Sequence, residues 1–224
     1  MKRRIAVLLI FISCAAPFLS AGKPRLIGEE KAKEAGLAFI NQVFGANETE
    51  ATVTYRTHAG ISYIDGEYVE TGDEQPAYFY VVSASERKDG QYGYYAQVNA
   101  ETGVAYRAAK SSSLLPDMTA EQRKAANAAY RDGDWINYDF TTVDVDCRDF
   151  AREWVTQTFH PKAPILGFID CGYLSDESLS PGVKTNFYVV IRDGTTYYID
   201  MAWPQLTVLE VGILNQIRPY MDEP

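Results

Sequence analysis

The chain has 224 residues, a formal net charge of −9 and 46% hydrophobic residues, with 16 tyrosines and 10 phenylalanines. This acidity argues against binding to nucleic acid or to anionic membrane surfaces, because both select basic patches. The hydrophobic and aromatic content excludes a disordered chain and is typical of a folded protein.

The first residues have the layout of a secretory signal. Three basic residues at positions 2–4 precede an apolar stretch over 5–16, Pro17 breaks it, and small residues lead to Ala21. The apolar stretch is too short for a good membrane span. We predict a signal peptide over residues 1–21, which makes the protein periplasmic or secreted and changes its net charge to −12.

A second interpretation of the leader is a lipid anchor. Residues 11–14 read Phe-Ile-Ser-Cys, a partial lipobox with Phe11 in place of the usual leucine. Cleavage before Cys14 and lipidation of its thiol would tether the protein to a membrane. Contact with a membrane is expected only in that case.

The first predicted element is an amphipathic helix over 29–44. Its apolar residues recur at helical spacing, from Ala32 through Phe39 and Ile40 to Phe44. An alternating strand over 51–55 follows. Strands over 79–82 and 94–98 then flank the turn residues Asp89-Gly90 and predict an antiparallel hairpin. A turn over 101–103 leads into a short strand over 104–107.

Residues 111–142 read as a linker with one short helix. Thr119 and Gln122 form a capping box that opens a helix through about Tyr130. Four alanines make this helix slim.

The second part of the chain repeats the first. A helix over 144–159 carries the same apolar stripe, shifted by 115 residues, so that Trp154 corresponds to Phe39. Residues 165–171 supply a strand, and the strands 187–191 and 197–201 flank Asp193-Gly194. We therefore predict an α+β fold of two tandem units, over 26–110 and 143–218, each with a helix packed on a small antiparallel sheet.

The first unit resembles the PepSY domain of secreted bacterial proteins. The resemblance lies in the helix "EEKAKEAGLAFI", the strand "YFYVV" and the hairpin "YYAQVNAETGVAYRA", with Asn99 where the family usually has Asp. It covers residues 28–108, and extends to 144–211 only through the internal repeat. It implies a cystatin-like fold and a non-catalytic role that restrains or assists a secreted peptidase. It brings no catalytic residues with it.

Two cysteines remain after removal of the leader, Cys147 and Cys171. In an oxidising compartment the simplest expectation is a disulfide that staples the second helix to its sheet. The alternative is a nucleophilic Cys147 served by His160, for which no orienting third group is evident.

The remaining candidates for chemistry are carboxylates. Asp144, Asp146 and Asp149 crowd the second helix, but the spacing does not fit an EF-hand, and capping explains them better. A second acidic tract over 65–74 reads as a solvated loop. We expect no metal, no cofactor and no catalytic residues.

A surplus of tyrosine points to recognition by the sheet. Strand alternation puts Phe79 and Phe187 on the face covered by the helices and the tyrosines on the other face. This candidate binding face comprises Tyr78, Tyr80, Tyr95, Tyr188 and Tyr198. Tyrosines suit a wet recognition surface, although they would equally suit packing between the two units.

Three functional hypotheses follow. The first is an exported, non-enzymatic module that binds another protein, a peptidase in particular, through the sheet face or strand edges. The second is a carrier of a small molecule or lipid with an aromatic-lined pocket between helix and sheet. The third is a hydrolase that uses Cys147 or a carboxylate pair.

Overall fold

The computed structural model describes residues 25–57, 61–64, 67–70, 78–87, 89–130, 138–174 and 179–214. The predicted signal peptide, Cys14 and most of the acidic tract lie outside these residues. The helices are α1 (Glu29–Phe44), α2 (Ala120–Ala129), α3 (Phe140–Phe159) and a short 3-10 helix η1 (Ser112–Leu114). None of the described helices combines the length and the apolarity that a membrane span requires.

The described strands belong to two sheets. The small sheet pairs β2 (Ile61–Ile64) with β3 (Glu67–Glu70). The large sheet is antiparallel and contains eight strands in the order β1-β4-β5-β6-β10-β9-β8-β7. Their bounds are β1 (Ala51–Thr57), β4 (Tyr78–Glu86), β5 (Tyr92–Asn99), β6 (Ala105–Lys110), β7 (Ile165–Leu174), β8 (Val183–Ile191), β9 (Thr196–Trp203) and β10 (Thr207–Ile213).

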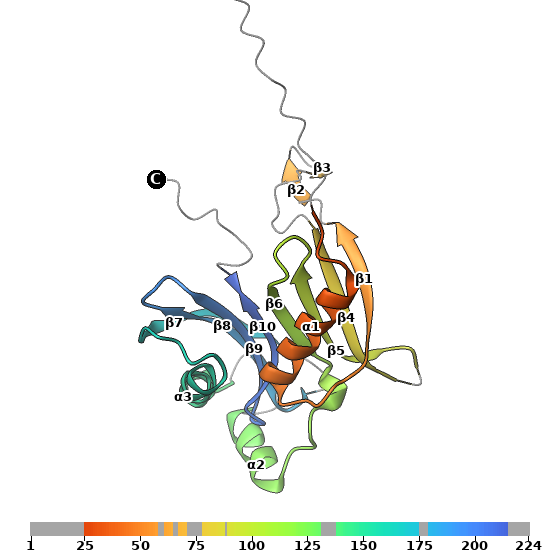
Figure 1. Cartoon of the computed structure of the whole chain (residues 1–224). Helices are drawn as coiled ribbons and strands as arrows, with labels where there is room; N and C mark the ends of the chain where they lie inside the picture. The colour runs from red at the N-terminus through yellow and green to blue at the C-terminus, as the bar shows by residue number, and fades with distance from the viewer. Residues whose placement is uncertain are drawn as a thin grey trace, which may run out of the picture.

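The α+β class is as predicted, but one continuous sheet replaces two small ones. The first half, α1 with β1, β4, β5 and β6, and the second half, α3 with β7 to β10, meet where β6 pairs with β10 (Figure 1). This seam contains three registered pairs, Arg107–Gly212, Ala108–Val211 and Ala109–Glu210. Two strand edges that would otherwise be open thus pair with each other. The predicted domain boundaries remain a prediction.

The hairpins on either side of the seam have the same register. Adding 103 to the residue numbers of β5 and β6 reproduces β9 and β10: Gln97 pairs with Arg107, and Asp200 pairs with Glu210. Each hairpin also has a bulge at the equivalent place, where Tyr106 and Leu209 are both buried. Because β6 and β10 are antiparallel, the two hairpins are related by an approximate two-fold axis through the seam.

Helix α1 has the predicted bounds and buries the predicted stripe. Ala32, Phe39, Ile40 and Val43 are buried against the sheet. The closest approach is at Gly36, where an added Cβ would lie 2.6 Å from the side chain of Val82. A glycine is needed here because the helix backbone lies directly on the strand.

Helix α3 begins at Phe140, four residues before the predicted start. The reason is its N-cap, Asp139, whose side chain accepts a hydrogen bond from the Thr141 amide at 3.2 Å. The acidic cluster therefore lies inside the helix and does not cap it. Asp146 accepts a 3.0 Å hydrogen bond from Trp203 Nε1, and Asp144 accepts one from the Tyr173 hydroxyl. These carboxylates attach α3 to β9 and β7.

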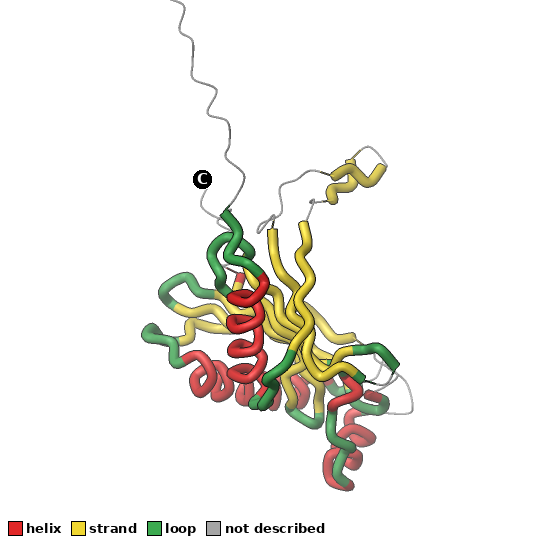
Figure 2. The backbone as a smooth tube through the Cα atoms, turned by 45° about the vertical axis from the view of Figure 1, so that its right-hand side comes forward, coloured by secondary structure: helices red, strands yellow, loops and turns green. Residues whose placement is uncertain are grey.

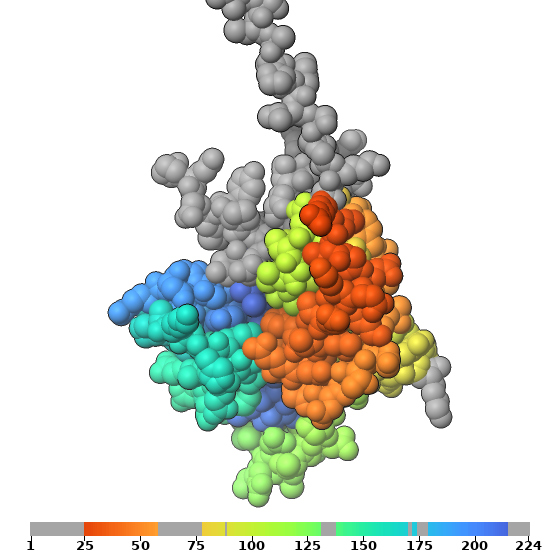
Figure 3. Space-filling view, viewed as in Figure 1, coloured from red at the N-terminus to blue at the C-terminus, as the bar shows by residue number. Residues whose placement is uncertain are grey.

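Both long helices lie against the same side of the large sheet, as the tube in Figure 2 shows. Their C-terminal ends meet: the rings of Phe39 and Phe159 are 6.3 Å apart, and Gln42 Nε2 donates to the Thr158 carbonyl at 2.9 Å. In the space-filling view α1 and α3 form adjoining surfaces (Figure 3). One buried core runs under both helices.

The predicted turns are confirmed. Gly90 and Gly194 have φ angles of 77° and 91°, and each closes a hairpin after an aspartate that caps the turn. Asn99 does the same for the next turn, because its Oδ1 accepts hydrogen bonds from two backbone amides. The capping box at Thr119 is also present.

Candidate functional site

The candidate site lies on the side of the large sheet opposite α1 and α3, which we call the helix-free face because neither long helix covers it. At its rim, Leu114 of the short helix η1 lies beside Gly93, and Leu115 packs against the buried cluster that contains Leu209.

Strand pairing assigns the residues of the helix-free face: Tyr95 lies opposite Ala109, and Tyr198 lies opposite Tyr188 and Gly212. All three of these tyrosines are half-buried. Three of the five predicted binding tyrosines therefore share one face on the two sides of the seam.

The other two predicted tyrosines point the opposite way. Tyr80 is 4% exposed and belongs to the core under α1, and Tyr78 packs on the same side. The prediction for β4 was thus wrong by one residue, since Tyr80, Val82 and Ala84 face the helix. The reason is that β4 and β8 correspond with a shift of 105, Val82 to Phe187, whereas the matching "FYVV" letters are 108 apart.

A salt bridge crosses the seam at the centre of the helix-free face. Arg107 on β6 donates from Nε to Glu210 Oε1 on β10 at 2.8 Å, and its Nη2 lies 2.7 Å from the same oxygen. The side chain of Glu210 is 13% exposed and that of Arg107 is 41% exposed. Under the shift of 103 these are equivalent positions, so each half supplies one charge of the pair.

A second polar group adjoins it on β8 and β9. Asp200 is 2% exposed and forms an ion pair with Lys184. Its Oδ1 accepts a 2.7 Å hydrogen bond from the Tyr198 hydroxyl, which in turn accepts one from Asn186 at 3.4 Å. We call Arg107, Lys184, Asn186, Tyr198, Asp200 and Glu210 the junction network.

Burial controls the acid–base properties of the junction network. Burial raises the pKa of Glu210, and the neighbouring Arg107 guanidinium partly offsets that rise. Burial, and then the hydrogen bond to Asp200, raises the pKa of Tyr198. Burial also raises the pKa of Tyr95. These tyrosines therefore stay neutral at physiological pH and act as hydrogen-bonding rings.

The network is balanced in charge and sits beside a shallow hollow. Two basic and two acidic side chains cancel, so the site has no strong attraction for a simple ion. A cavity of about 340 Å³ adjoins it, lined by Arg107, Tyr188, Tyr198, Glu210, Gly212 and Leu214. Aromatic rings with exposed polar edges are the chemistry that protein interfaces use.

Cys147 is unsuited to nucleophilic chemistry. It is 1% exposed, and burial, followed by the charges of Asp146 and Asp144, raises the pKa of its thiol to about 12. Its proposed base, His160, ends the same helix and is exposed. In the structure Cys147 is a free thiol, and the side chain of Cys171 lies outside the described residues. The predicted disulfide therefore stays a prediction.

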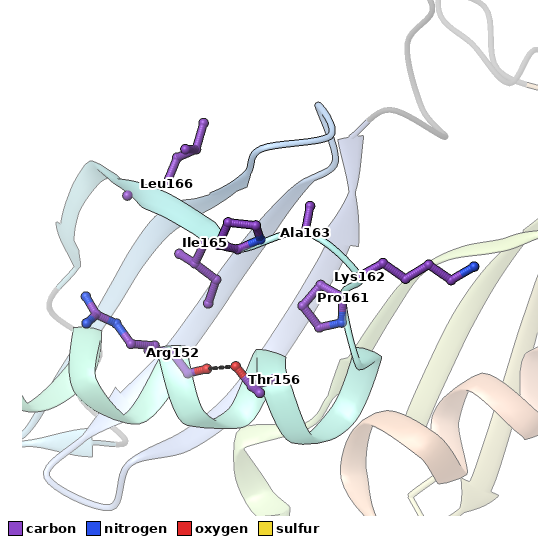
Figure 4. A pocket seen from close by; sticks show the side chains of 9 residues that line it. Arg152, Thr156, Pro161, Lys162, Ala163, Ile165 and Leu166 are labelled. Carbon is purple, nitrogen blue, oxygen red and sulfur yellow. Dashed lines mark hydrogen bonds between the residues drawn. The ribbon is translucent and has the colours of Figure 1, made fainter.

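A more voluminous cavity is a groove at the other end of the second half. It has a volume of about 770 Å³ and lies between the end of α3 and the start of β7. Arg152 and Thr156 line it from the helix, and Pro161, Ala163 and Ile165 line it from the chain leading into β7 (Figure 4). Its lining contains no aromatic residue, unlike the pocket expected of a carrier.

The side chains between the helices and the sheet belong to one buried core. Ile40, Val82, Val98 and Val155 each have no exposed surface. No group of three or more metal-ligating side chains gathers anywhere in the described parts of the chain. His58 lies outside them.

Sequence reasoning missed five members of the junction network: Arg107, Lys184, Asn186, Asp200 and Glu210. A signal was available for one pair. The Asp193-Gly194 turn places Lys184 diagonally across from Asp200 in the hairpin, where opposite charges attract. The pairing of Arg107 with Glu210 had no local signal, because it depends on the joining of the two halves.

No protein-family model matches the chain, and no curated protein matches it. A solved structure, the C-terminal domain of Bacillus megaterium YpeB, superimposes with a TM-score of 0.42 at 10% sequence identity. The match covers 86% of this chain and 65% of that one.

Proposed function

We propose that this protein is an exported, non-catalytic module that binds another protein through the helix-free face of its large sheet. The observation that supports this proposal is the junction network, where neutral tyrosine rings and two ion pairs gather around the seam. The resemblance of the first unit to PepSY domains favours a secreted peptidase as the partner. The buried, protonated thiol of Cys147 argues against a cysteine hydrolase.

The test is capture of partners from the host's own envelope and secreted proteins, with matched tyrosine variants. Tyr95→Ala combined with Tyr188→Ala removes two rings from the helix-free face. Tyr78→Ala removes one ring from the helix-covered face and serves as the control. All three chains are first checked for unchanged folding by circular dichroism.

The double variant is expected to weaken binding of the captured partner by at least about tenfold, because aromatic rings dominate such interfaces. The control variant should bind as the unmodified chain does. Unchanged binding by the double variant would remove the helix-free face from consideration. Addition of the partner peptidase's substrate would then show whether the complex restrains or assists cleavage.

A further inference from the structure

Strand β1 is the outermost strand of the first half, as Figure 1 shows. It pairs with β4 on one side, and on its other side no strand pairs with it in the described ranges. Such an edge presents a row of backbone donors and acceptors to any extended chain that fits. Proteins usually carry features that prevent pairing at such edges, so the presence or absence of these features indicates whether an edge is available to a partner.

The two edge strands of the sheet differ in the features that prevent pairing. Strand β7, at the opposite edge, has two register shifts, between Ile165 and Gly167 and between Asp170 and Gly172. Bulges of this kind twist an edge strand and discourage pairing. Strand β1 has no bulge, because its seven pairs with β4 are consecutive, and it contains no proline or lysine; Arg56 is its one charged residue.

The side chains of β1 favour pairing as well. Its sequence, "ATVTYRT", consists largely of threonine, valine and tyrosine, which favour strands. The last four residues, Thr54 to Thr57, are all exposed. Tyr55 keeps 37% of its surface exposed although its ring contacts those of Tyr78 and Tyr80. A β-forming, regular and exposed edge is therefore left without an intramolecular partner among the described strands.

We propose that β1 pairs antiparallel with β1 of a second copy of this chain, around a two-fold axis at Thr54. This register keeps all seven residues paired. It places Thr54 opposite its own counterpart, Val53 opposite Tyr55 of the partner subunit, and Thr52 opposite Arg56 of the partner subunit. Valine with tyrosine and threonine with threonine are favourable cross-strand pairs, and no like charges lie opposite each other.

The resulting dimer has a continuous sheet with the α1 helices on one side. It leaves the junction network free, because that network lies at the seam, three strands from β1. The dimer is therefore independent of the proposed function. Pairing of one short strand buries less surface area than a standard protein–protein interface. The dimer should therefore form reversibly, and its population should depend on protein concentration.

Analytical ultracentrifugation of the chain without its leader, from about 1 μM to about 1 mM, tests for this equilibrium. We expect a monomer–dimer transition in this range. Thr54→Lys places two like charges opposite each other on the axis and should raise the dissociation constant by at least about tenfold. The same substitution is harmless to the monomer, because lysine is common on exposed edge strands.

Cross-linking tests the register directly. Thr54→Cys brings two sulfur-bearing Cβ atoms to about 4.5–5.5 Å across the axis, within reach of a disulfide. Thr52→Cys, on the same face, separates them by about 13 Å and is the matched control. The unmodified chain serves as the control for cross-linking through the native cysteines. Rapid dimer formation by Thr54→Cys alone is the expected result on a non-reducing gel.

Four results would overturn the proposal. One is a monomer at every concentration. Another is a dimer that Thr54→Lys leaves intact, which would place the interface elsewhere. The third is equal cross-linking by Thr54→Cys and Thr52→Cys. A monomer whose β1 amides become protected by a foreign peptide would likewise show that the occupant of this edge is not a second copy.

Discussion

At the scale of single residues, Cys147 shows how burial decides chemistry. Its thiol is enclosed in the core, and its pKa is raised to about 12. We predict that Cys147 in the native protein does not react with thiol reagents at pH 8 and reacts fully after denaturation and reduction. Peptide mapping of the labelled protein checks this. Labelling of native Cys147 at the rate of an exposed cysteine would contradict it.

The same experiment decides the disulfide. The mass of the unreduced protein is two hydrogens lower if Cys147 and Cys171 are bonded. A full mass together with a label on Cys147 after denaturation without reductant would establish the free thiol seen in the structure.

Glu210 gives the junction network a pH dependence. Its pKa is raised in the folded state by burial, above the ordinary value of 4.5, so the stability from its protonated form is present below 4.5 and is lost as pH rises through the raised pKa. The Glu210→Gln variant does not lose stability in this way, because glutamine does not titrate. We predict that the unfolding free energy of the unmodified chain, relative to that of the variant, decreases between pH 4 and pH 7. Parallel urea titrations at each pH measure this difference. A difference that stays constant or increases with pH would contradict the assignment.

At the scale of elements, the contact of α1 with β4 depends on a missing side chain. Gly36→Ala adds a Cβ 2.6 Å from Val82. Alanine favours the helix by about 1 kcal/mol, but overpacking costs about 1–3 kcal/mol, so we predict a net loss of stability of about 1 kcal/mol. Urea denaturation measures it.

The matched control reduces the obstacle. In a Val82→Ala background the added methyl group no longer meets the two Cγ atoms of Val82, although the Cβ atom of residue 82 stays 2.6 Å away, so Gly36→Ala should cost less than in the unmodified chain. Equal losses in both backgrounds would mean that the cost does not come from this contact.

The helices and hairpins could be predicted from local sequence patterns, but the face to which each strand directs its side chains was harder to predict. The stripe from Ala32 to Val43 and the Asp-Gly turns gave α1 and both hairpins. The prediction assigned the side chains of β4 to the wrong faces, because the four residues "FYVV" place large hydrophobic or aromatic side chains on both faces. The following residues held the answer: Ser83 and Ser85 continue the outer face, and Ala84 continues the inner one. An alternation read over eight residues is more decisive than one read over four.

At the scale of the whole molecule, the joining of the two halves was beyond prediction. The seam has only three backbone pairs between strands about a hundred residues apart in the chain, and no local pattern indicates it. Three tyrosines of the candidate site, Tyr95, Tyr188 and Tyr198, were nevertheless assigned to the correct face, because each follows the alternation of its own hairpin. The ion pair of Arg107 with Glu210 was not predicted, because it forms only where the two halves join.

A shared core predicts that the halves unfold together. Buried residues of both halves form one cluster, and Phe39 contacts Phe159 across it. All three tryptophans lie in the second part of the chain, at positions 135, 154 and 203. We predict that Phe39→Ala, in the first half, lowers the urea midpoint reported by tryptophan fluorescence, with a cost of about 3 kcal/mol. An unchanged urea midpoint of the fluorescence transition in Phe39→Ala would mean that the halves unfold separately.

The binding surface that we propose is the helix-free face at the seam. Amide hydrogen exchange of the chain, with and without its captured partner, tests this claim most directly. We predict slower exchange in peptides that cover β6, β9 and β10, and unchanged exchange in α1 and α3. Protection confined to the helices, or to the groove between α3 and β7, would contradict the claim.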